Sequence, residues 1–121
     1  MQIMSSTACR ASLSGLIGEI NACYTLWDIN TGFPVYVGTA KTAARLRVHL
    51  KKDEPSREQT KHLQDNVAFH QYVKKQKSGW LGVSSTFHTD APQATLSERA
   101  LILEYGIRHQ GGQLFNRRMS G

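Results

Sequence analysis

The sequence lacks several features that would assign a protein class at once. Its 121 residues contain no apolar run approaching the length of about 18 residues that spans a membrane, so no membrane partner is expected. The two cysteines, Cys9 and Cys23, are too few for a disulfide framework or a cysteine-rich zinc site, and Cys23 is expected to be a small buried hydrophobic residue. Ser14 and Gly15 interrupt the short N-terminal apolar patch, which argues against a secretory signal and makes the cytoplasm the default location.

Acidic residues are also scarce, and their distribution is uneven. The chain has nine acidic and 15 basic residues, which gives a net charge of +6. Residues 1–40 carry a net charge of −1, whereas residues 41–121 carry +7. Positive charge concentrated in this way suits a surface that binds a polyanion, because neutralising phosphates releases counterions. A merely solvated basic surface is the alternative interpretation.

No repeat or low-complexity tract divides the chain, and its length suits one domain. Apolar periodicity, turn residues and capping patterns predict an α+β domain with a small three-stranded antiparallel sheet flanked by helices, in the order β-β-α-α-β-α. Residues 1–20 are expected to be a flexible or helical lead-in, 21–118 the domain and 119–121 a tail. The predicted elements are strands at 22–28 and 33–37, helices at 41–52 and 56–77, a strand at 80–88 and a helix at 95–110.

The first two predicted strands form a hairpin. Asn30-Thr31-Gly32 supplies the turn, and Pro34, which has no N–H to donate, is expected at the start of its strand or on a sheet edge. Tyr24 and Tyr36 then lie on paired strands and can point to the same face, although the pattern leaves the register open.

A group of basic residues follows this hairpin. Lys41, Arg45 and His49 are spaced by four, so on a helix they would form a strip along one side. The strand-to-helix junction after Gly38 also offers backbone N–H groups, which favour phosphate. Gly38 and Lys41 are therefore candidate nucleic-acid contacts, together with Arg47, Lys51 and Lys52.

Glu104 is the carboxylate that the pattern singles out in the last helix. It follows Ala100, Leu101 and Leu103 and precedes Ile107, so it is embedded in an apolar stretch. A carboxylate is costly to bury unless a charged group meets it. A divalent metal ion and an arginine are the two candidate partners.

Taken together, these segments resemble the GIY-YIG nuclease family. The segments Ala22-Cys23-Tyr24 and Tyr36-Val37-Gly38 are similar to its two name-giving motifs, and the stretch from Gly38 to Arg45 is similar to its lysine and arginine segment. The run ending in Glu104, with Asn116 twelve residues later, resembles the family's metal-binding glutamate and its asparagine. The likeness covers roughly residues 20–118. Only the tyrosine of the first motif is kept, and the interval before Arg45 is one residue short of that in excinuclease members, which leaves Arg47 as the alternative catalytic arginine.

The resemblance implies a fold and an activity. It implies an endonuclease that hydrolyses DNA, with RNA as an open alternative, using one Mg²⁺ or Mn²⁺ ion held by Glu104. Arg45 with Lys41 would stabilise negative charge, Asn116 would support the site by hydrogen bonds, and His49 would hold a tyrosine or pass on a proton. A tyrosine would act as the base, which requires nearby cations to lower its pKa. Either tyrosine could have this role, and Tyr24 is favoured, with Tyr36 orienting the water. A protein partner or a homodimer could supply target specificity. The alternatives are an inactive nucleic-acid-binding module and a basic protein-interaction domain.

Overall fold

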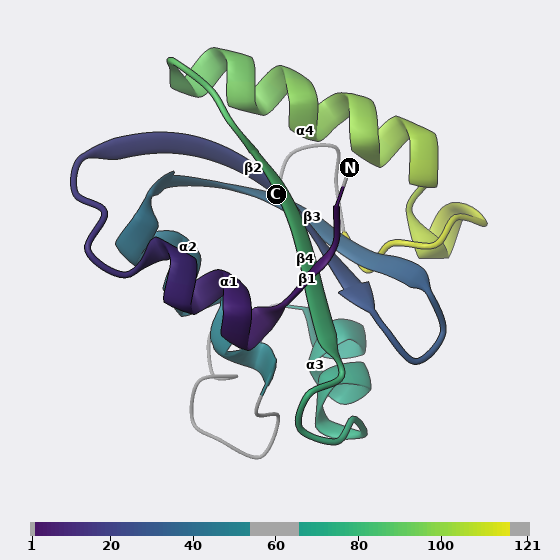
Figure 1. The fold of residues 1–121 in the computed structure, drawn as a ribbon. Coiled ribbons are helices and arrows are strands. Elements are labelled where there is room, and N and C mark those ends of the chain that lie inside the picture. The colour runs from purple at the N-terminus through teal and green to yellow at the C-terminus, as the bar shows by residue number, and fades with distance from the viewer. Residues whose placement is uncertain (1, 54–65, 117–121) are drawn as a thin grey trace.

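The computed structural model describes residues 2–53 and 66–116. Within them the protein is an α+β fold with one antiparallel sheet in the strand order β1-β4-β2-β3. Figure 1 shows α1 and α2 on one side of this sheet and α4 on the other. The elements are β1 Met4–Ser5, α1 Ser6–Leu13, β2 Glu19–Asp28, β3 Phe33–Thr42, α2 Ala43–His49, the 3-10 turn η1 Leu50–Asp53, α3 Val67–Lys74, β4 Leu81–Phe87, α4 Ala91–Tyr105 and the 3-10 turn η3 Arg108–Gln110.

The α+β class and the antiparallel sheet are confirmed, but the sheet has four strands within the described residues where three were predicted. The additional strand comes from the segment predicted to be a lead-in, because Met4 pairs with Val83 and Ser5 with Gly82. Ser5 then caps α1 by accepting a hydrogen bond from the backbone N–H of Ala8 at 3.1 Å. In the described part of the chain no helix is long and apolar enough to cross a membrane.

The predicted hairpin is confirmed. Strands β2 and β3 are joined by a turn in which Gly32 adopts a φ of +78° and donates to the carbonyl of Asp28 at 2.8 Å. β3 ends the sheet order, so Pro34 lies on an edge strand, as expected for a residue without an N–H to donate. The hairpin therefore carries both tyrosines of the predicted site into one local structure.

The helix boundaries differ from the sequence prediction. The helix expected from residue 41 begins at Ala43, because Thr42 is its N-cap and accepts from the Arg45 N–H at 3.2 Å. The last helix begins at Ala91, capped by Asp90, which accepts from the N–H of Gln93 at 2.9 Å. The predicted start of the intervening helix at residue 56 lies outside the described residues, and α3 begins at Val67.

Helix α4 buries a different face from the predicted one. Its buried residues are Ala94, Glu98 and Ile102, which recur every four positions, whereas Leu96 and Leu103 are 65% and 73% exposed. Apolar residues occur on both sides of this helix, so its hydrophobic pattern does not identify the side that faces the sheet. The glutamate that lies in the interior is therefore Glu98 and not Glu104.

Candidate functional site

Tyr24 and Tyr36 lie on the same face of the β2–β3 hairpin. Tyr24 is paired with Gly38, and Leu26 is paired with Tyr36, so the two tyrosines are diagonal neighbours across a regular part of the ladder. The Tyr24 ring lies across Gly38, where an added methyl group would be only 2.6 Å from the phenol oxygen. Position 38 therefore requires a glycine, because any side chain there would clash with the Tyr24 ring. It is buried beneath the ring, which corrects the prediction that it contacts nucleic acid.

Helix α2 adds Arg45 and His49 to this face. The His49 ring stacks on Tyr24 with 5.5 Å between centroids, and the Arg45 charge is near enough to Tyr24 to lower its pKa. Arg45 itself is exposed, as a residue that meets a phosphate must be. Lys41 does not continue the strip, because it belongs to β3 and its ammonium lies 3.3 Å from the carboxylate of Glu19.

The acidic group whose charge acts on Tyr24 is Glu98. The expectation that Glu104 is embedded among apolar residues is wrong, whereas its assignment as a metal ligand stays a prediction. Glu98 is 2% exposed and raises the pKa of both Cys23 and Tyr24. Glu104 is exposed, since six residues at 100° per residue turn it well away from Glu98 on the helix surface. A helix start read from Asp90 and Pro92 would have included Ala94, which shares the buried side of α4 with Glu98 and Ile102.

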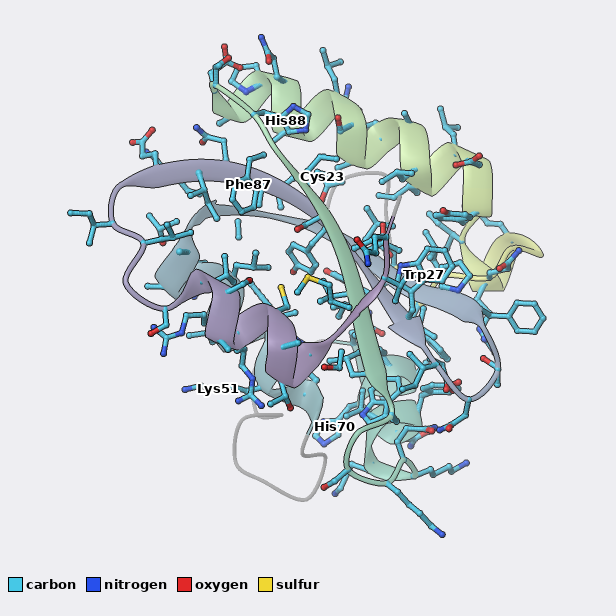
Figure 2. All side chains as sticks on the ribbon, viewed as in Figure 1. Cys23, Trp27, Lys51, His70, Phe87 and His88 are labelled. Carbon is cyan, nitrogen blue, oxygen red and sulfur yellow. The ribbon has the colours of Figure 1, made fainter. Side chains whose placement is uncertain are left out.

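Glu98 approaches the tyrosines from the opposite layer of the fold. Helix α4 packs through Ile102 against Cys23 and Val37, whereas Tyr24 belongs to the cluster on the other face of the sheet. Figure 2 labels Cys23 in the layer between the strands and α4. Glu98 and Arg45 therefore act on Tyr24 from opposite faces of the sheet.

The surroundings of Tyr24 do not favour loss of its proton. Burial raises its pKa well above 10, and Tyr36 and Glu98 raise it further, while Arg45 opposes them only in part. The expectation that nearby cations lower the Tyr24 pKa is therefore wrong, because burial of an anion outweighs one exposed guanidinium. A phenol in these surroundings keeps its proton and can donate a hydrogen bond. Tyr36, the alternative base, is half-buried, and the choice between the two tyrosines stays a prediction.

Asn116 is buried and holds the strand that carries Tyr36. Its side-chain oxygen accepts from the Val37 N–H at 2.9 Å, and its amide donates to the Val37 carbonyl at 2.7 Å. These two bonds satisfy the outer backbone groups of edge strand β3 between Tyr36 and Gly38. Asn116 thus supports the site through the backbone, as a positioning residue.

The predicted nucleic-acid-binding cations divide into two kinds. Arg47 on α2 is exposed, and Lys51 is labelled in Figure 2 where it points outward beside the turn after α2. Lys52 is different, because it is 2% exposed and donates to the His49 carbonyl at 3.0 Å. Its prediction as a surface contact is wrong, and no charge pattern in the sequence separates it from Lys51.

The acidic and sulfur or imidazole ligands are too dispersed to make a closed metal cage. Across residues 2–53 and 66–116, no group of three such side chains could hold an ion together. Glu98 is a buried carboxylate whose charge acts on Tyr24, on the sheet face opposite to Arg45 and the two tyrosines. That donor set suits Mg²⁺ or Mn²⁺, since such ions bind through one or two carboxylates and keep water and substrate phosphate as their other ligands.

Comparison with known proteins identifies no relative of this chain. No family model, curated protein or solved structure matches the chain. The arguments for function therefore come from the arrangement of the side chains and from the motif resemblance.

Proposed function

We propose that this protein is a divalent-metal-dependent nuclease with a GIY-YIG-like site. The observation that carries the proposal is the grouping of two tyrosines with Arg45 and His49 on one face of the β2–β3 hairpin and α2. The buried carboxylate of Glu98, on the opposite face of the sheet, adds a negative charge that acts on Tyr24. Phosphodiester hydrolysis needs a cation for the developing negative charge, a carboxylate that can hold a metal ion and a hydroxyl that orients water. Few other reactions require this combination beside a basic surface.

Each residue of the proposed site has a separate role in the reaction. Arg45 binds the scissile phosphate, and its exposure leaves it open to a large polyanion. Tyr36, as the phenolate, orients the attacking water and accepts its proton, while Tyr24 stays protonated and can donate a hydrogen bond, held by the stacked ring of His49. Glu98 would hold the ion, which when bound supplies Lewis-acid stabilisation of the phosphate and the leaving oxygen. Asn116 fixes the backbone beside Tyr36.

Two glutamates on α4 provide a matched test. Glu98→Gln should abolish nicking of plasmid DNA in Mg²⁺ or Mn²⁺, whereas Glu104→Gln, on an exposed face of the same helix, should cleave as the unmodified protein does. Circular dichroism melting checks that both variants fold. Full activity of Glu98→Gln, or loss of activity in Glu104→Gln alone, would refute the assignment of the metal ligand.

One observation favours an inactive binding module of the same design. Tyr24 and Glu98 are each 2% exposed, and a reacting phosphate needs access to the groups that act on it. A gel shift with DNA accompanied by no cleavage in any divalent metal would decide for this second function. Cleavage that Glu98→Gln removes would decide against it.

A further inference from the structure

A groove opens between the start of β3 and the loop that follows α4. Its volume is 370 Å³, and its lining residues are Phe33, Arg108, Gly112 and Gln113. Phe33 is the first residue of the edge strand, and 60% of its surface is exposed. An exposed aromatic ring beside an arginine is an arrangement that recurs where proteins stack nucleobases. We call this feature the Phe33–Arg108 groove.

Arg108 is held in place within this groove. Its guanidinium lies 4.2 Å from the ring centroid of Phe115 and 5.9 Å from that of Tyr72, and its Nε donates to the carbonyl of Gln113 at 3.4 Å. Its backbone N–H donates to Leu114 at 2.7 Å. The side chain remains exposed. A cation ordered before binding loses less conformational entropy when an anion arrives.

A continuous row of rings links the groove to the candidate site. Phe115, beneath Arg108, stacks on Phe69 at 5.5 Å, and Phe69 stacks on Tyr36 at 5.2 Å with the planes 2° apart. The Phe115 N–H also donates to Val35 of β3 at 2.8 Å. Along β3, Phe33 precedes Tyr36 by three residues, or about 10 Å. Two to three stacked nucleotides span about that distance at 3.4 Å each.

We infer that the Phe33–Arg108 groove binds an unpaired nucleotide that flanks the phosphodiester at Tyr36, an inference that rests on the proposed function. The exposed face of Phe33 stacks on the base, and Arg108 meets the neighbouring phosphate. None of the four lining residues is acidic, which fits an anionic ligand. Inside a duplex both faces of a base are already covered by its neighbours. The substrate class is therefore single-stranded, flapped or frayed nucleic acid.

The test measures binding in EDTA, so that it does not depend on cleavage. Fluorescence anisotropy is recorded with a labelled oligothymidylate and with a blunt-ended duplex of the same length. Phe33→Ala should weaken oligothymidylate binding by about 5- to 160-fold, the range for loss of one aromatic–base stack, and change duplex binding less than about 2-fold. Arg108→Gln should also weaken single-strand binding.

Phe87→Ala is the matched control, because Phe87 is 51% exposed and lies near the opposite end of the sheet, as Figure 2 shows. Equal losses for single strand and duplex, equal effects of Phe33→Ala and Phe87→Ala, or no binding of oligothymidylate would each overturn the inference. If Glu98→Gln still cleaves DNA but Phe33→Ala loses single-strand binding selectively, the metal-ligand assignment fails and the groove stands. If instead Glu98→Gln abolishes cleavage and Phe33→Ala causes no selective loss of single-strand binding, only the inference about the groove fails.

Discussion

Lys52 offers the sharpest test of the electrostatics around α2. Its ammonium is buried beside the last turn of that helix, and burial, followed by the charge of Arg45, lowers its pKa from 10.5 to about 7. The Lys52→Met substitution keeps an unbranched chain of similar length and removes the charge. The substitution therefore measures how much the buried ammonium of Lys52 lowers the free energy of unfolding.

The sign follows from proton binding. Between pH 7 and 10.5 the unfolded chain holds a proton on Lys52 that the folded chain has released, so stability increases as pH rises through that window. At pH 7 and below, where both states are charged, the full penalty applies and amounts to about 5 kcal/mol. Lys52→Met removes this penalty and loses a hydrogen bond to the His49 carbonyl worth about 1 kcal/mol.

The variant should therefore be more stable than the unmodified protein by about 4 kcal/mol at pH 6, as an order of magnitude. That advantage should vanish near pH 10. Urea unfolding at several pH values measures the difference, and titrations common to both proteins cancel in it. Lys51→Met, on the same 3-10 turn and only partly buried, controls for the loss of a positive charge and should change stability by less than about 0.5 kcal/mol. If the free energies of unfolding of Lys52→Met and of the unmodified protein change with pH in parallel, the reasoning is refuted.

Two further substitutions test the hairpin that carries the tyrosines. Gly38→Ala should destabilise the protein by about 1–3 kcal/mol in urea unfolding, because the new methyl group meets the Tyr24 phenol in a packed interior; unchanged stability would mean that the ring is free to move aside. Asn116→Ala should cost about 2 kcal/mol or more, since it leaves the N–H and carbonyl of Val37 without partners, whereas Asn116→Asp keeps the bond from the N–H and should cost less. Equal losses for the two Asn116 variants would contradict the role of the N–H bond.

The sequence patterns that predicted the fold correctly are local ones. A turn with Gly32 between two strands rich in aromatic and branched residues has few alternative structures, and the hairpin formed as predicted. The pairing of Met4 with Val83 could not be predicted, because a two-residue strand has no periodicity and its partner lies 79 positions away. Long-range pairing of short segments depends on the folded core, which sequence periodicity does not describe.

The same distinction between local and long-range structure applies to the candidate site. Tyr24, Tyr36 and Arg45 belong to one continuous stretch of chain, so local structure alone brings them together. The choice between the two glutamates depends on the rotation of α4 about its axis. Apolar neighbours made Glu104 a candidate for burial, but Leu103 beside it is 73% exposed, whereas Ala94 and Ile102 bury the side that carries Glu98.

The start of α4 was also predicted too late. The Asp90 carboxylate caps the first turn, and Pro92 suits only that turn, so these residues mark where the helix begins. The prediction began this helix at residue 95, which left Ala94 outside it and hid the buried series of Ala94, Glu98 and Ile102. Capping residues determine where a helix begins, whereas the face that it buries depends on how it packs against the sheet. In this protein that packing places Glu98, and not Glu104, in the interior.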